Sequence, residues 1–193
     1  MTVNDIIGDA RNARARELKT ALAEAKARLA EAEAARDALL SHFDLALAAL
    51  HDFERLGPDG SFRIIDGWNV LLHCRNVSKL SSEEISKLKA DYLASLGIVP
   101  HPSPLTSHPS PLTWLIFDGP EENSYVSGAY RVTYTGGTGP QRADRLILDY
   151  VHAARLLGLD VSRLCVETAD KTLMKKVEAL GAKVSPPCFQ ING

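Results

Sequence analysis

The chain has 193 residues, of which 45% are hydrophobic and 24% charged, and its formal net charge is −2. These values are those of an ordinary soluble protein with room for one globular domain and an additional element. The chain contains no apolar run of about 18 residues and no apolar core of a signal peptide, so we expect neither a membrane span nor secretion.

The first third of the chain is predicted to be a coiled-coil helix over residues 1–56. Residues 5–56 lack proline and are rich in Ala, Leu, Glu, Arg and Lys, which favour helices. Apolar residues recur in alternating steps of four and three, with Arg36 as the one interruption. They are Leu18, Leu22, Ala25, Leu29, Ala32, Leu39, Phe43, Ala46, Leu50 and Phe53. Two arrangements remain open: pairing as a homodimer or with a partner helix, and packing on the chain's own domain.

A second unit begins after a turn-forming linker at residues 57–61, which contains two glycines and a proline. From residue 62 to residue 193, strand-like and helix-like segments alternate. This alternation predicts an α/β domain with a doubly wound, mainly parallel sheet. We expect strands near 62–66, 113–118, 130–135, 162–168 and 182–185, and helices near 68–75, 82–96, 141–157 and 170–180.

A proline-rich insertion at residues 100–113 contains a direct repeat. The heptapeptide that begins at His101 is followed at once by a second copy of its first six residues, beginning at His108. Prolines at this density favour an extended, solvated connector. The repeated context favours a surface loop over a metal site for these two histidines.

Four aspartates stand where a predicted strand ends or a predicted helix begins: Asp66, Asp118, Asp144 and Asp170. In a parallel sheet, the carboxyl ends of the strands lie on one edge, and ligands bind there. Gathered carboxylates repel one another unless a cation joins them, and Mg²⁺ or Mn²⁺ prefers such oxygen ligands. Taken together, the aspartates predict a metal site that suits hydrolysis of phosphate esters.

Each aspartate also has a structural interpretation. Asp66 and Asp170 precede predicted helices and could cap them, and Asp118 before Gly119-Pro120 suits a turn. Asp144 near a helix start would be favoured by the helix dipole. The metal site is favoured only by the convergence of all four on one edge.

Two polar residues are expected to support the aspartates, and three basic residues to hold a nucleic-acid backbone. Asn69 follows Asp66 by one helical turn, and Thr168 lies two residues before Asp170. The basic residues are Arg142 and Arg145, beside a glycine-rich loop, and Lys171 at the start of the last helix. The alternative for all three is a solvated surface charge.

At these residues the chain resembles the NYN domain, in particular the YacP-like ribonuclease branch of the PIN-like nuclease superfamily. The resemblance covers about residues 62–185 and rests on DGWN at 66–69, FDG at 117–119, AD at 143–144 and TAD at 168–170. It implies a PIN-like fold in which the four aspartates hold Mg²⁺ or Mn²⁺. It also implies RNA as substrate, including mRNA associated with the ribosome. Arg142 and Arg145 depart from the family pattern, which often has a threonine before the AD pair and an acidic residue after it.

Two RNA-related functions follow as hypotheses, and a third possibility is a pure coiled-coil assembly protein that binds no RNA. The first is a metal-dependent endoribonuclease in which a metal-activated water attacks the phosphodiester bond. The second is a non-catalytic RNA- or ribosome-binding adaptor that dimerises through its coiled coil.

The cysteines favour a reducing compartment. Cys74, Cys165 and Cys188 are widely spaced, form no CxxC pair and leave one thiol over in any disulfide scheme. Cys165 lies in an apolar segment typical of a core thiol. We therefore expect a cytoplasmic protein.

Overall fold

The computed structural model describes residues 3–73, 80–99, 112–137, 139 and 141–187; in the first helix it describes the side chains of residues 14–33, 36, 37, 40 and 42–55. The chain divides into two compact units, Met1–Asp44 and Leu45–Gly193. Helix α1 (Val3–Arg55) supplies the described part of the first unit. The second unit contains the last turns of α1 and an α/β domain.

The domain is built on one mainly parallel sheet, in which the described residues form six strands in the order β3-β4-β2-β1-β5-β6. The strands are β1 (Phe62–Asp66), β2 (Thr113–Phe117), β3 (Glu122–Ser127), β4 (Tyr130–Thr135), β5 (Leu164–Glu167) and β6 (Lys183–Ser185). Neighbouring strands pair in parallel, except that β3 is antiparallel to β4. The predicted α/β class with a mainly parallel sheet is therefore confirmed.

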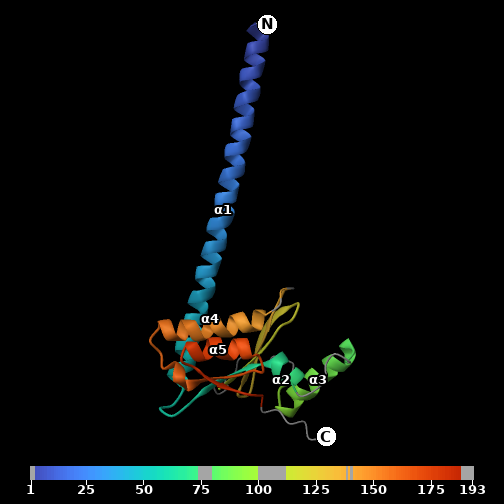
Figure 1. The fold of residues 1–193 in the computed structure, drawn as a ribbon, viewed down its shortest axis with the longest axis vertical. Helices are drawn as coiled ribbons and strands as arrows, with labels where there is room; N and C mark the ends of the chain where they lie inside the picture. Colours follow the sequence, from blue (N-terminus) through green and yellow to red (C-terminus); the bar gives the residue numbers. More distant parts are fainter. Residues whose placement is uncertain (1–2, 74–79, 100–111, 138, 140, 188–193) are drawn as a thin grey trace. The chain divides into compact units, whose positions relative to one another are not determined.

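Helices cover both faces of this sheet (Figure 1). Helices α2 (Gly67–His73) and α3 (Ser82–Ser95) pack on one face, and α4 (Arg142–Leu156) and α5 (Lys171–Ala179) pack on the other. A short 3-10 helix, η2 (Val161–Arg163), precedes β5. Because side chains alternate along a strand, Ile64 lies in the core beneath α4 and α5, and Ile65 lies in the core beneath α2 and α3.

One strand was missed by the sequence analysis, which expected no strand between residues 118 and 130. Strand β3 begins with three exposed polar residues, Glu122, Asn123 and Ser124, so the hydrophobic pattern of a strand is absent there. It turns back onto β4 through Gly128, whose φ of 57° is accessible to glycine without strain. As the last strand of the sheet, β3 needs only one paired edge, and a polar exposed edge discourages pairing with other chains.

The last turns of α1 belong to the core of the domain. Ala49, Phe53 and Leu56 are buried with the residues of α4 and α5. The contacts therefore divide the chain between Asp44 and Leu45, inside the helix, whereas the sequence analysis placed the boundary at residues 57–61. The heptad pattern continues across this division, since burial in a domain core and pairing in a coiled coil both require an apolar stripe.

A buried polar network anchors these turns. Asp52 is 4% exposed and accepts hydrogen bonds from both terminal nitrogens of Arg131, at 3.1 and 2.6 Å. The hydroxyl of Tyr150, on α4, donates to the same carboxylate at 2.8 Å. Arg131 also lies over the ring of Trp114, 5.1 Å from its centroid. The network links α1, α4 and the sheet through one carboxylate.

In the first unit, α1 is a continuous helix, as the sequence analysis expected. Its predicted stripe is apolar and exposed to solvent within the unit: Leu18 and Leu22 are each 57% exposed and Leu29 is 60% exposed. Pairing of this stripe in a coiled coil stays a prediction. No helix among the described residues has both the length and the apolar character needed to cross a membrane. The proline-rich insertion lies outside the described residues except for Leu112 and Thr113.

Candidate active site

Three neighbouring strands deliver polar side chains to one place at the carboxyl edge of the sheet. Every second residue of β1, β2 and β5 faces the core beneath α4 and α5. Asp66, Asp118 and Thr168 occupy the next position of the same series, where each strand ends. Because β2, β1 and β5 are adjacent and parallel, these three side chains turn toward the same face at the same edge.

The chain also diverges at this edge. After β1 it continues into α2 on one face of the sheet, and after β5 it continues into α5 on the other face. The divergence of two neighbouring strands opens a crevice at their carboxyl ends, where ligands of open α/β sheets bind. A hydrogen bond from Thr168 Oγ1 to Asp66 Oδ2, 3.0 Å long, crosses between the two strands at this point.

Asp66 is held rigidly in the crevice and is 2% exposed. Its carboxylate accepts hydrogen bonds from the Asn69 side chain and backbone as well as from Thr168. Burial raises the pKa of Asp66, the hydrogen bonds from Asn69 and Thr168 oppose that rise, and the charge of Asp118 adds to it. The two residues expected to support the aspartates therefore both contact Asp66 and fix its orientation.

Asp118 follows β2 and fixes the start of α4. Its Oδ1 accepts hydrogen bonds from the backbone amide of Ala143, at 2.7 Å, and from Thr135 Oγ1, at 2.9 Å. Gln141, the residue before the helix, has a φ of 58° and caps no amide with its side chain. Asp118 thus supplies the missing cap from a neighbouring strand, and so places Asp144, the residue after Ala143, beside the crevice.

Asp170 caps α5, as its structural interpretation expected. Its Oδ1 accepts hydrogen bonds from the backbone amides of Thr172, at 2.6 Å, and Leu173, at 3.1 Å. Its own amide donates to Thr168 Oγ1 at 3.1 Å. One hydroxyl therefore connects Asp170 to Asp66, since the same Thr168 oxygen donates to Asp66.

Asp144 differs from the other three aspartates, because no hydrogen bond between described residues reaches its carboxylate. Its pKa is raised from 3.8 to about 6, first by burial and then by the charges of Asp66, Asp170 and Asp118. Lys176 opposes this rise. The charges of the other three predicted aspartates therefore all act on Asp144, and a cation would stabilise its negative charge.

The four carboxylates do not form a closed cage for a metal. Within the described residues, no group of three or more His, Cys, Asp or Glu side chains is arranged to hold an ion. Mg²⁺ keeps several waters and binds through one or two carboxylates, so it does not require a closed set of protein ligands. Of the three neighbouring carboxylates, Asp66 acts most strongly on the pKa of Asp144, so these two are the most strongly coupled pair at this edge. Both oxygens of Asp66 also accept hydrogen bonds, whereas the hydrogen bonds to Asp118 and Asp170 engage only Oδ1.

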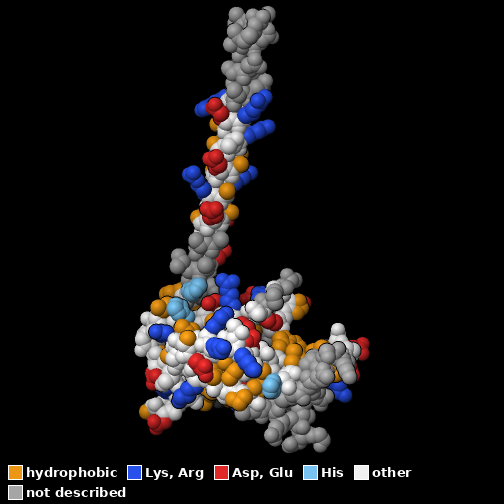
Figure 2. Space-filling view, in the orientation of Figure 1, with side chains coloured by type: hydrophobic (Ala, Val, Ile, Leu, Met, Phe, Trp, Pro, Cys, Tyr) orange, Lys and Arg blue, Asp and Glu red, His pale blue; other side chains and the backbone are white. Residues whose placement is uncertain are grey.

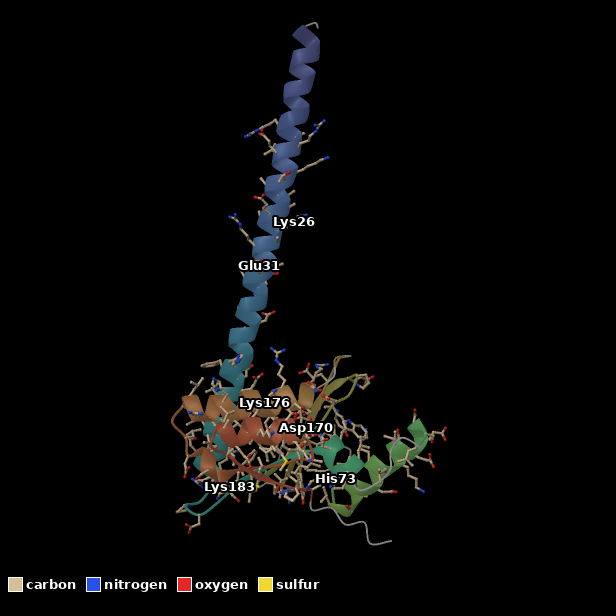
Figure 3. The ribbon with its side chains drawn as sticks, in the orientation of Figure 1. Lys26, Glu31, His73, Asp170, Lys176 and Lys183 are labelled. Carbon is tan, nitrogen blue, oxygen red and sulfur yellow. The ribbon has the colours of Figure 1, made fainter. Side chains whose placement is uncertain are left out.

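A pocket of about 360 Å³ lies between α4 and α5 beside these carboxylates. Asp144, Asp149 and Asp170 line it together with Arg145 and Lys176. It therefore carries both signs of charge, with Asp144 and Lys176 close enough to affect each other. Figure 3 shows Asp170 at the start of α5 and Lys176 farther along the same helix.

The three residues predicted to bind RNA occupy three different settings. Arg145 lines the pocket, and its side chain is 85% exposed, with only a long ion pair of 3.9 Å to Asp149. Arg142 donates a hydrogen bond of 2.5 Å to the carbonyl of Thr135 and packs against Gly137, so it braces the loop before α4. Lys171 is exposed and does not line the pocket. An RNA-binding role for each stays a prediction.

Lys176 was not among the predicted site residues. It follows Thr172 and Leu173 by four and three residues, so the three side chains share the face of α5 that lines the pocket. Counted from the Asp170 cap, the three lysines of α5 all lie roughly 100–140° round the helix from Asp170, in one direction or the other, so spacing alone does not show which of them faces the site. Singling out Lys176 requires knowing which face of α5 meets α4.

Comparisons with known proteins show a weak structural similarity. No family model matches the chain, and no curated protein matches its sequence. Among solved structures, the chain is similar to the crystal structure of a mutant of Rae1 (YacP) from Bacillus subtilis, with 16% identity and a TM-score of 0.38. The match covers 66% of this chain and 70% of that one. At this level of similarity the functional argument rests on the geometry of the chain's own residues.

Proposed function

We propose that the protein is a metal-dependent endoribonuclease whose site is the carboxyl edge described above. The single observation that carries the proposal is the convergence of the three other aspartates on Asp144, whose pKa is raised to about 6 by burial and by their charges. A purely structural role explains the hydrogen bonds of Asp118 and Asp170, but for Asp144 it offers only the helix dipole, which burial and the three neighbouring charges oppose. A cation bound there would remove the repulsion.

In this proposal Asp66 and Asp144 hold Mg²⁺ or Mn²⁺, with Asn69 and Thr168 orienting Asp66. Asp118 holds the start of α4 so that Asp144 faces the crevice. Such an ion polarises a phosphodiester and lowers the pKa of a coordinated water. RNA as the substrate is supported by the motif resemblance to NYN domains and by residues 131–193, which carry 9 Lys or Arg against 6 Asp or Glu. That the protein acts on mRNA associated with the ribosome stays a prediction.

We expect the purified full chain to cut a labelled RNA pool in Mn²⁺ or Mg²⁺ and to leave it intact in EDTA. The expectation follows because the proposed chemistry needs a cation at Asp66 and Asp144. The measurement is the appearance of internal cleavage products on a denaturing gel over time. Equal cutting in EDTA and in Mn²⁺ would remove the metal from the proposal.

A second candidate function is a non-catalytic RNA-binding adaptor. It is favoured by the helix-capping roles of Asp118 and Asp170 and by the lack, among the described side chains, of a three-ligand metal group. The adaptor predicts that RNA binds without being cut in any divalent metal, and that Asp66→Asn leaves binding intact. The cleavage assay above separates the two functions.

We also propose that the helix of the first unit pairs with a second copy of the chain. The exposed heptad stripe has the spacing of a coiled coil, and in a parallel pair Arg28 of one helix would face Glu33 of the other. Arg36 falls on the stripe and would face its own copy, which costs stability but fixes the register.

We expect light scattering of the full chain to give twice the mass of one chain. Leu22→Glu combined with Leu29→Glu should give the single mass, because charges would enter the apolar seam. Both leucines are exposed within their unit, so the change leaves the α/β domain folded. The matched control is Ala23→Glu with Ala30→Glu, one position away from the stripe, which should stay dimeric. A single mass for the parent would exclude the dimer.

A further inference from the structure

We propose that Lys176 binds a backbone phosphate of the nucleic acid in the pocket between α4 and α5, beside the carboxylate edge. This inference deepens the proposed function and rests on it for the identity of the substrate. The pocket is lined at one end by Asp144 and Asp170 and carries the Lys176 ammonium within electrostatic reach of Asp144. A carboxylate that holds a cation and an ammonium that holds an anion would then act on one phosphodiester.

The ammonium of Lys176 is available for such a contact. Among the described residues, no hydrogen bond or ion pair within 4.0 Å involves its side chain, and the residue is exposed. Its interaction with Asp144 is electrostatic only, so a phosphate oxygen can approach the ammonium without first breaking a salt bridge. A lysine acts on phosphate as a compact point charge with three donors.

The pocket around Lys176 is lined by a second basic residue, Arg145, as well as by three aspartates. Figure 2 shows Lys and Arg side chains gathered over α4 and α5. The ion pair of Arg145 with Asp149 is long and exposed, so it contributes little stability, and a phosphate could take the place of Asp149. Several basic side chains spread over α4 and α5 suit the repeated phosphates of a single strand better than they suit one small anion.

Helix α5 offers its own controls. Lys171 and Lys175 are exposed residues of the same helix, carry the same charge and do not line the pocket. If Lys176 acts only through the overall charge of α5, replacing any of the three lysines will have the same effect. If Lys176 touches the phosphate, its replacement alone will stand out.

The test is binding of a fluorescent single-stranded RNA to the full chain in EDTA, over a series of salt concentrations. Lys176→Gln is expected to weaken binding roughly tenfold and to lower the salt slope by about 0.7, the change for one lost phosphate contact on a single strand. Lys171→Gln and Lys175→Gln are expected to change binding less than about twofold, and Lys176→Arg to retain it, because the charge remains.

Equal losses for all three glutamine variants, or no loss for Lys176→Gln, would overturn the assignment. Because EDTA prevents metal-dependent cutting, the binding result stands whether or not the protein proves to be a nuclease. Where cleavage is observed, Lys176→Gln should raise KM severalfold more than Lys175→Gln does. An unchanged KM would also overturn the assignment.

Discussion

Asp144→Asn is expected to reduce RNA cleavage by about a thousandfold. The variant keeps the size of the side chain but removes the charge that the neighbouring carboxylates and burial act upon. A bound metal contributes several kcal/mol of transition-state stabilisation, and about 1.4 kcal/mol corresponds to a factor of ten in rate. The measurement is the single-turnover rate of cleavage of a labelled RNA at saturating Mn²⁺.

The same substitution should leave the fold intact or stabilise it. At neutral pH the carboxylate of Asp144 is repelled by Asp66, Asp170 and Asp118, so a neutral amide is expected to gain roughly 1 kcal/mol after allowance for solvent screening. Urea unfolding in EDTA measures this change. Loss of activity with retained or increased stability is typical of a functional charge rather than a structural one.

Asp149→Asn is the matched control. Asp149 lines the same pocket on the same helix, but it pairs loosely with Arg145 at 3.9 Å and does not contribute to the raised pKa of Asp144. Its replacement is expected to change the cleavage rate less than about threefold, as for a surface ion pair. Equal effects at Asp144 and Asp149 would contradict the assignment of the site.

Asp52→Ala is expected to cost about 3–5 kcal/mol of the free energy of unfolding. The carboxylate accepts hydrogen bonds from Arg131 and from the fully buried Tyr150. Burial of the Tyr150 hydroxyl, together with the charge of Asp52, raises the pKa of Tyr150 well above its ordinary range. Removing the carboxylate leaves a largely buried guanidinium and a buried hydroxyl without their acceptor.

Urea unfolding followed by circular dichroism measures this loss. Asp91→Ala is the control, because Asp91 is an exposed residue of α3, and its replacement should change stability by less than about 0.5 kcal/mol. A change below about 1 kcal/mol for Asp52→Ala would contradict the role of the network. For the same reason, a fragment that begins at residue 58 would lose this anchor, whereas one that begins at residue 45 would keep it.

Much of the fold could be predicted from the sequence, because strands and helices alternate with clear punctuation. The exception, β3, shows the limit of hydrophobic pattern. Its first half is polar and exposed, and it is a strand only because β4 supplies its hydrogen bonds. Such an edge strand is defined by its neighbour and not by its own residues.

The sequence predicted which residues gather at the site, but not which contacts each of them makes. The position of Asp66, Asp118, Asp144 and Asp170 at strand ends and helix starts was sufficient to expect them on one edge. Their individual roles were not predictable, because Asp118 caps a helix that begins 24 residues later in the chain. A hydrogen bond between distant segments depends on the register of the sheet, which local sequence does not encode.

The heptad stripe of α1 correctly predicted a helix, but its apolar residues have different surroundings in the two units of the chain. The last turns of the helix pack in the domain core, where Phe53 is buried. The sequence analysis did not single out Asp52, whose hydrogen-bond partners lie 79 and 98 residues away along the chain. Only tertiary contacts distinguish a buried charge from an exposed one in such a sequence.

The most direct test of the central claim is a titration of Mn²⁺ into the RNA-free protein, followed by the electron paramagnetic resonance signal of the free ion. The full chain is expected to remove Mn²⁺ from solution at a saturable site. The double variant Asp66→Asn/Asp144→Asn, shown to be folded by circular dichroism, should leave the ion free. Equal uptake of Mn²⁺ by the parent and the double variant, or none by the parent, would contradict the assignment of these aspartates as a metal site.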